Sequence, residues 1–284
     1  YIDWGPFFQT WDLAGPFPAI LKDEIVGTEA VRVYADGQRM LKRLIEGRWL
    51  SASGVVGFWP ANTVNDDDIE LYTDESRSEV ALTWYGMRQQ TEKHEIDGVM
   101  RPSRCLADFV APRDSGVKDY VGMFAVTAGL GVEKKEKYFV DDLDDYSAIM
   151  LKALADRLAE AFAEALHHRV RTDLWGYASD ESLSNDDMIA EKYRGIRPAP
   201  GYPACPDHSV KKPMFDLLNC ADIGMSLTES LAMMPAASVS GFYLSHPDST
   251  YFNVGKIGHD QLQDQAARRK ESEADLERLL APNL

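Results

Sequence analysis

The chain has 284 residues, 45% of them hydrophobic, which is enough for the core of one large domain or of two small ones. Its 46 acidic residues outnumber its 30 Lys and Arg residues, and the net charge of −16 argues against a nucleic acid as partner. No apolar run reaches the roughly 18 residues that a membrane span needs, so we expect no membrane partner either.

The cysteines are Cys105, Cys205 and Cys220, and they form neither a CxxC pair nor a zinc-type spacing. We therefore expect reduced thiols in a cytoplasmic protein, and no metal site. The chain starts at Tyr1 within aromatic sequence and without an initiator Met, which suggests a piece of a longer protein.

Residues 1–18 are rich in aromatic side chains and are expected to pack against a core. Asp3 lies among these aromatics and has two interpretations. It is either a carboxylate that caps a helix or faces solvent, or a buried carboxylate that pairs with a cation. Residues 23–47 have the pattern of an amphipathic helix, which we expect to be interrupted near Asp36 and Gly37.

Strand patterns dominate the next part of the chain. We predict a turn at 62–67, a loop at 94–104, and strands at 54–60, 68–72, 79–85, 105–110 and 120–127. Because these strands cluster without helices between each pair, the sheet should be antiparallel or mixed. Residues 127–134 contain a Gly-x-Gly after a strand, but Lys134 stands where a third glycine is needed. We interpret this stretch as an ordinary turn and not as a Rossmann-type nucleotide loop.

The clearest helix is predicted over residues 144–171. Its buried stripe consists of Leu151, Leu154, Leu158, Phe162 and Ala165. The other side carries three carboxylates that are four residues apart, namely Asp156, Glu160 and Glu164. Either this is a solvated acidic face, or Glu160 faces a ligand amine or a basic partner. His167 and His168 diverge around the helix, so we do not expect them to share a metal ion.

Residues 194–208 read RGIRPAPGYPACPDH, and their four prolines exclude both a helix interior and a central strand. We expect a rigid loop in which Gly201 permits a positive φ or a close approach to the backbone. Such a loop would present the Arg197 guanidinium, which suits a carboxylate or phosphate, together with the Tyr202 ring. The alternative is a stiff connector in which both side chains merely pack.

Beyond this loop we predict a short helix at 211–219, an apolar segment at 227–234, a strand at 238–244 and a charged helix at 260–280. A turn at 245–249 precedes Tyr251 and Phe252, two aromatics that either belong to the core or line a pocket. No internal repeat, low-complexity tract or linker divides the sequence.

Four strings of residues agree with one family: YIDWGPFFQTW, ADRLAEAFAEALH, RPAPGYPACPDH and SVSGFYLSHPDSTYF. They resemble the C-terminal activation domain of cobalamin-dependent methionine synthases, and the resemblance runs from Tyr1 to the closing LAPNL. It implies a single α+β domain over residues 1–284, built on a twisted antiparallel sheet with flanking helices, without a Rossmann fold.

The resemblance also implies a function in reactivation. Members of this family bind S-adenosylmethionine, and cobalamin is held on a neighbouring module of the same parent chain. When that cobalamin is oxidised to cob(II)alamin, an electron from flavodoxin or a flavodoxin-like reductase and a methyl group from S-adenosylmethionine restore methylcobalamin. The chain would be a cytoplasmic part of a methyltransferase, without turnover of its own. The alternative is a non-catalytic interaction module that docks flavodoxin-type and cobalamin modules.

The resemblance assigns S-adenosylmethionine-binding roles to Asp3, Glu160, Arg197, Ala199, Gly201, Tyr202, Tyr251 and Phe252. Arg197 would pair with the methionine carboxylate. Of the side chains Asp3 and Glu160, one would meet the ammonium and the other the ribose, and the resemblance does not decide which. Asp156 is a possible partner-facing residue. We expect no residue to act as a chemical catalyst, because a cob(I)alamin nucleophile and an activated sulfonium need only alignment and exclusion of water.

Overall fold

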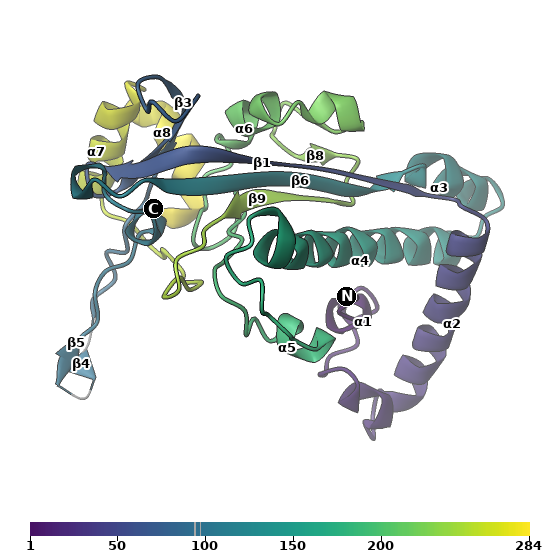
Figure 1. Ribbon diagram of the computed structural model, residues 1–284. Helices are drawn as coiled ribbons and strands as arrows, with labels where there is room; N and C mark the ends of the chain where they lie inside the picture. The colour runs from purple at the N-terminus through teal and green to yellow at the C-terminus, as the bar shows by residue number, and fades with distance from the viewer. Residues whose placement is uncertain (94, 97) are drawn as a thin grey trace. The chain divides into compact units, whose positions relative to one another are not determined.

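The computed structural model describes residues 1–93, 95–96 and 98–284, which form an α+β fold (Figure 1). Five strands form one antiparallel sheet in the order β3-β2-β1-β6-β9. These strands are β1 (Ser51–Val64), β2 (Asp68–Tyr72), β3 (Val80–Tyr85), β6 (Asp119–Leu130) and β9 (Ser238–Tyr243). The predicted α+β class with an antiparallel sheet and flanking helices is therefore confirmed, and the fold is not of the Rossmann type.

Helices occupy much of the remaining chain. The α-helices are α1 (Gly5–Gln9), α2 (Gly27–Glu46), α3 (Val132–Asp141), α4 (Asp145–Arg169), α5 (Asn185–Ile189), α6 (Lys211–Leu217), α7 (His259–Arg269) and α8 (Glu273–Leu280). Short 3₁₀ turns are η1 (Ala19–Lys22), η2 (Leu106–Phe109), η3 (Arg113–Ser115), η5 (Cys220–Ile223) and η6 (Ala281–Asn283). Among the described residues, none of the helices combines the length and the apolar composition of a membrane span.

The chain forms two compact units, each composed of three segments. Unit 1 consists of Tyr1–Val55, Ala125–Tyr193 and Cys220–Val239. Unit 2 consists of Val56–Phe124, Arg194–Asn219 and Ser240–Leu284. Strands β1, β6 and β9 each contribute residues to both units.

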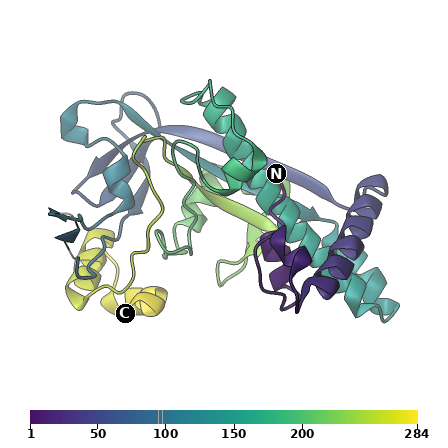
Figure 2. The same cartoon turned by 90° about the horizontal axis from the view of Figure 1, so that it is seen from below.

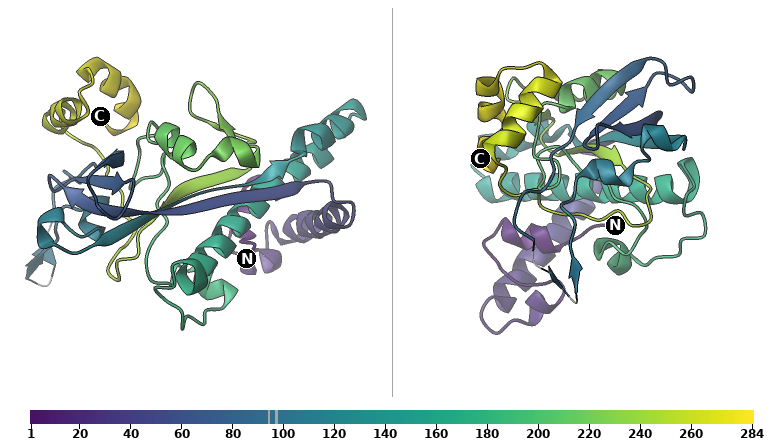
Figure 3. Two further views of the ribbon diagram at one scale, coloured as in Figure 1. Left: turned by 45° about the horizontal axis from the view of Figure 1, so that its top comes forward. Right: turned by 90° about the vertical axis from the view of Figure 1, so that its left-hand side faces the viewer.

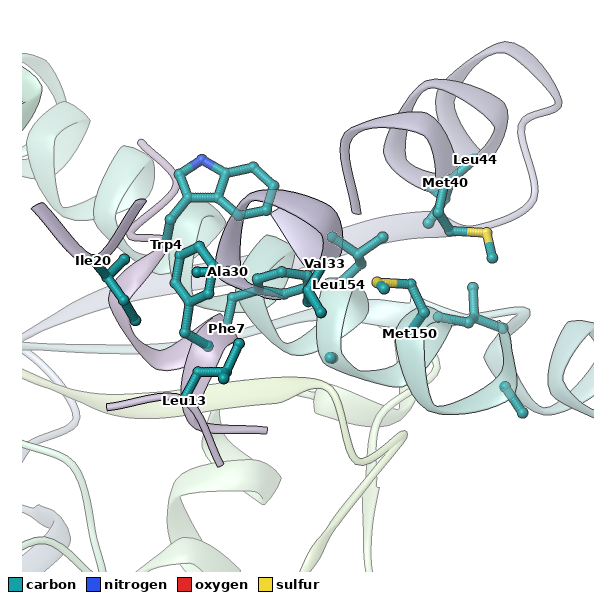
Figure 4. Packing of buried hydrophobic residues seen from close by; sticks show 14 of the residues in the cluster. Trp4, Phe7, Leu13, Ile20, Ala30, Val33, Met40, Leu44, Met150 and Leu154 are labelled. Carbon is teal, nitrogen blue, oxygen red and sulfur yellow. The ribbon is translucent and has the colours of Figure 1, made fainter. Parts of the chain in front are cut away.

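In unit 1, α1 lies beside α2 and α4 (Figures 1 and 2), and an aromatic core fills the space between them. Phe7 is fully buried, and the Trp4 ring meets it edge-on with 5.3 Å between the ring centroids. Figure 4 shows Trp4 and Phe7 gathered with Val33 and Leu154. The aromatic opening of the sequence therefore packs into a core, as predicted.

Helix α2 is continuous, so the predicted interruption near Asp36 and Gly37 is wrong. Gly37 is buried, and a Cβ atom at this position would lie 2.7 Å from Cζ of Phe7. The glycine thus makes room for an aromatic ring rather than ending the helix, because an isolated glycine costs only about 1 kcal/mol in a helix.

Helix α4 confirms the strongest helix prediction. The Asp144 side chain accepts a hydrogen bond of 3.0 Å from the Ser147 amide and caps the N-terminus. Ala155 and Ala159 pack against Ala128 of β6, where small side chains allow a close approach of helix and strand. The helix ends at Arg169 and continues as the π-helical turn η4 (Val170–Leu174).

In unit 2, the C-terminal region forms two helices, α7 and α8 (Figure 3), where one helix over 260–280 is predicted. The helical conformation is interrupted at Lys270, which has a φ of 59°. The Ser272 side chain then caps the N-terminus of α8. Helix α7 is fixed to the segment after β3 by Gln261, whose side chain bonds both the amide and the carbonyl of Arg88 at 2.7 and 2.9 Å.

Residues 105–110 do not form the predicted strand but contain the 3₁₀ turn η2. The Asp108 carboxylate accepts a 2.9 Å hydrogen bond from the Cys105 amide, which closes this turn. Most of the stretch is buried, and a short buried apolar run has no periodicity that separates strand from turn.

Short strand pairs occupy two other segments. The predicted loop at 94–104 contains the pair β4 (Glu95–Ile96) and β5 (Val99–Met100), while its residues His94 and Asp97 lie outside the described residues. The apolar segment at 227–234 lies within a second pair, β7 (Ser226–Leu227) and β8 (Met233–Met234).

The stretch tested as a nucleotide loop is the junction between β6 and α3. Gly131 has a φ of 102° and precedes the first residue of α3, so the interpretation as a turn holds. The charged helix α3 itself was not predicted, because only part of its sequence carries an apolar stripe.

Candidate functional site

The proline-rich loop at 194–208 begins as an addition to the edge of β9. Ile196 and Leu244 exchange two backbone hydrogen bonds of 3.0 Å, and the Phe242 amide donates to the Pro198 carbonyl at 2.9 Å. Gly241 makes this approach possible, since a Cβ atom there would lie 2.6 Å from the Pro198 oxygen. The first half of the loop is therefore fixed by backbone contacts.

The second half of the loop turns at Gly201, which has a φ of +95°. A Cβ atom at this position would overlap the ring of His208, so the glycine meets both conditions predicted for it, the positive φ and the close approach. The Gly201 amide donates to the Cys205 carbonyl at 2.7 Å. The buried Cys205 thiol in turn accepts a 3.3 Å hydrogen bond from the Trp84 indole.

The structure brings together two of the predicted ligand-binding residues, Arg197 and Tyr251. The Arg197 amide donates a 3.0 Å hydrogen bond to the Tyr251 hydroxyl, and both residues are half-buried. A further bond of 2.9 Å joins the Val254 amide to the Pro203 carbonyl. The segment after β9 thus holds the loop at two points, which agrees with the predicted rigid loop.

The other predicted residues of unit 2 differ in exposure. Tyr202 is 59% exposed at the tip of the loop, whereas Ala199 is half-buried. Phe252 packs against a hydrophobic cluster that includes Val254, with its ring centroid 6.5 Å from that of Phe109. More than half of the Tyr202 surface is therefore exposed to solvent, while Phe252 packs in part against this hydrophobic cluster.

Asp3 and Glu160 belong to unit 1, and the other six predicted residues belong to unit 2. Oδ1 of Asp3 accepts a 2.9 Å hydrogen bond from the amide of Gly5, the first residue of α1, but the N-cap residue of this helix is Trp4. The carboxylate is half-buried and has acceptor capacity beyond this one bond.

The acidic side of α4 is not uniformly solvated. Asp156 is exposed and Glu160 is half-buried, but Glu164 is only 6% exposed. Its Oε1 lies 3.8 Å from Nη1 of Arg171. The solvated-face interpretation is therefore wrong for Glu164, which the sequence pattern could not distinguish from its neighbours.

The three cysteines are buried, and none of them forms a disulfide. Burial raises the pKa of Cys105 and of Cys205 to about 12, so that neither is a reactive thiolate at neutral pH. Among the residues described, no group of three or more His, Cys, Asp or Glu side chains is placed to hold a metal ion.

The proline-rich loop therefore carries a half-buried arginine, Arg197, and an exposed tyrosine, Tyr202, on a backbone that hydrogen bonds hold on two sides. Its chemistry suits a ligand that carries a carboxylate, because a guanidinium binds this group through two parallel hydrogen bonds. Sequence reasoning missed the contribution of Gly241, although a glycine inside a strand is itself a signal for a close backbone contact.

Comparison with known proteins agrees with the family that the four strings resemble. Residues 1–270 match the family described as "Vitamin B12 dependent methionine synthase, activation domain". The structure of a MetH reactivation domain bound to AdoHcy is similar, with a TM-score of 0.94 and 55% sequence identity, over 100% of this chain and 86% of that chain. The chain therefore belongs to the activation-domain family of vitamin B12-dependent methionine synthases.

Proposed function

We propose that this chain binds S-adenosylmethionine and supports the reductive remethylation of cob(II)alamin, which reactivates methionine synthase in methionine biosynthesis. The observation that carries the proposal is the 55% identity to a reactivation domain that binds AdoHcy. AdoHcy is S-adenosylmethionine without the transferred methyl group, so the two ligands offer a protein the same carboxylate, ammonium, ribose and adenine.

The proposed ligand contacts are Asp3, Glu160, Arg197, Ala199, Gly201, Tyr202, Tyr251 and Phe252. Arg197 pairs with the ligand carboxylate, and the hydrogen bond from its amide to the Tyr251 hydroxyl fixes the backbone from which its side chain extends. Asp3 and Glu160 supply negative charge for the ammonium or acceptors for the ribose hydroxyls. The half-buried state of Arg197 favours the pair, since screening by water is weaker there than at the surface.

The role of these residues is positioning. Cobalamin, supplied by a neighbouring module, provides the atom that accepts the methyl group. The chain holds the sulfonium in one orientation and excludes water, which lowers the entropic cost of the transfer. No residue of this chain is assigned as a catalyst, and the isolated chain is expected to bind its ligand without turnover.

The proposed partners are the cobalamin-binding module of the same parent chain and a flavodoxin or flavodoxin-like reductase that supplies the electron. Asp156 is exposed on α4 and available to such a partner. We assign the domain to residues 1–284, of which 1–270 match the family, and place it in the cytoplasm, where cysteines remain reduced.

Titration calorimetry with S-adenosylmethionine and with AdoHcy tests the function. We expect the unmodified chain to bind both, and Arg197→Ala to weaken binding by about tenfold or more, because a charge-assisted bidentate pair is lost. Arg113→Ala is the matched control, since Arg113 is an exposed arginine of the same unit that pairs with Glu70.

The two outcomes that contradict the proposal are distinct. An unchanged affinity in Arg197→Ala would remove the carboxylate assignment while keeping ligand binding. No binding of either ligand by the unmodified chain would favour the second candidate, an interaction module that docks the cobalamin and flavodoxin-type modules without a ligand of its own.

A further inference from the structure

A buried ionic cluster lies where α4 passes into its π-helical turn, in unit 1. Arg171 is fully buried, and its Nε and Nη2 atoms each donate a 2.8 Å hydrogen bond to the Glu181 carboxylate. Its Nη1 atom lies 3.8 Å from Oε1 of Glu164. Taking these charges out of water is costly, and such pairs seldom add net stability, so packing alone does not account for them.

The cluster extends to the last residue before the proline-rich loop. The Arg171 guanidinium carbon lies 4.2 Å from the centroid of the Tyr193 ring, a cation–π contact in a desolvated setting. The buried His167 ring also contacts Tyr193 edge-on, with 4.8 Å between the two ring centroids. Tyr193 directly precedes Arg194, where the loop begins.

The cluster also extends to the start of the chain. The Tyr1 hydroxyl and Nδ1 of His168 share a hydrogen bond of 2.8 Å. Nε2 of the same imidazole lies 3.9 Å from Oε1 of Glu181. Tyr1 is two residues before Asp3, so the polar contacts that begin at Arg171 reach the segment that carries this carboxylate.

Glu160 is on the same helix as the cluster. It precedes Glu164 by four residues, or about one turn, so these two carboxylates lie on one side of α4. Glu164 in turn lies 3.8 Å from Arg171, so it links this side of α4 to the cluster. The π-helical turn at Arg171 is a local departure from α geometry of the kind often found at functional sites.

We propose that Arg171 and Glu181 are positioning residues for S-adenosylmethionine, which hold Asp3 through Tyr1 and His168, and Glu160 through α4. The inference rests on the proposed function, because the two carboxylates matter only if the ligand binds. Neither Arg171 nor Glu181 is assigned a contact with the ligand itself.

The test measures the dissociation constant for S-adenosylmethionine by calorimetry, at a temperature well below the melting temperature of every variant. Tyr1→Phe removes one hydroxyl from an exposed side chain and should weaken binding about threefold, the value of one hydrogen bond. Glu181→Gln removes the charge beside Arg171 and should weaken binding about tenfold. Tyr138→Phe, at another exposed tyrosine of unit 1, is the matched control and should bind like the unmodified chain.

A double variant separates positioning from a purely structural role. Tyr1 and Glu181 both act through His168, so Tyr1→Phe combined with Glu181→Gln should lose less affinity than the product of the two single effects. If Glu181→Gln fails to fold, Arg171→Met with Glu181→Leu replaces the ion pair by apolar groups, a change that is often neutral for stability. Weaker binding by this folded variant supports positioning.

Two results would overturn the inference and are told apart by the unmodified chain. If that chain binds while Tyr1→Phe and the folded cluster variants bind equally well, the cluster is structural only and the proposed function stands. If the unmodified chain binds no S-adenosylmethionine, the proposed function fails and the positioning role fails with it.

Discussion

Gly201 occupies a position where both the backbone and a neighbouring side chain exclude a Cβ atom. Its φ is +95°, and the His208 ring fills the space that an alanine would need. We expect Gly201→Ala to lower the free energy of unfolding by about 1–2 kcal/mol and to weaken S-adenosylmethionine binding, because the turn that carries Tyr202 must shift. Denaturant unfolding and calorimetry measure the two effects.

Gly116 offers a control for this substitution. It also has a positive φ, of 72°, but no heavy atom would lie within 4 Å of an added Cβ. Gly116→Ala therefore reports backbone strain alone and should leave ligand binding unchanged. Equal losses of stability in both variants, with equal binding, would show that the His208 contact has no importance.

Asp68 gives the protein a defined pH dependence. Its side chain is 3% exposed, and burial raises its pKa to about 6 although Arg268 lies beside it. Between about pH 4 and 6 the folded chain retains a proton that the unfolded chain has released, so the contribution of this group to stability falls as the pH rises through this window. Below and above it, this contribution is constant.

The variant Asp68→Asn tests that sign. Denaturant unfolding of both proteins between pH 4 and 7 should show that the unmodified chain loses up to about 1 kcal/mol per pH unit relative to the variant across the window. The two proteins should differ least near pH 4, where the folded chain holds Asp68 protonated and therefore as neutral as the asparagine of the variant. A difference between the two proteins that does not vary with pH would contradict the assignment.

The residues of the candidate site show what a sequence can and cannot predict. Proline and glycine fix backbone geometry locally, so the rigid loop and the special conformation at Gly201 were predictable. The ligand and the more distant residues came only from the family resemblance. Arg171 was not predictable, because a charged residue near a helix end normally reaches solvent, and its burial depends on Glu181, which lies beyond a turn.

At the scale of whole elements, long periodic segments were predicted best. Helix α4 and strand β2 follow the sequence pattern closely, since many residues contribute to each signal. Short segments were predicted poorly. The turn η2 was taken for a strand, and the break at Lys270 was not foreseen, because a few buried apolar residues or one left-handed residue leave little periodic signal.

Helix α2 provides the prediction for this scale. Gly37→Ala should stabilise α2 by about 1 kcal/mol, because alanine has the higher helix propensity. It should also force the new methyl group against Phe7, at a cost of about 1–3 kcal/mol. We therefore expect a net loss of stability in thermal or denaturant unfolding. Adding Phe7→Leu, which shortens the facing side chain, should reduce the penalty of the alanine. A Gly37→Ala variant more stable than the unmodified chain would show that the close contact is not what selects glycine.

At the scale of the whole molecule, ligand binding and turnover should separate. A ligand that binds only the folded chain stabilises it by about 2.7 kcal/mol at a concentration of 100 times its dissociation constant. S-adenosylmethionine should therefore raise the melting temperature in a concentration-dependent way, while chromatography detects no loss of its methyl group. Supplying a cobalamin-loaded module together with a reductant should start that loss. Consumption of S-adenosylmethionine by the chain alone would contradict the positioning role, because it would require a methyl acceptor or a catalyst within these 284 residues.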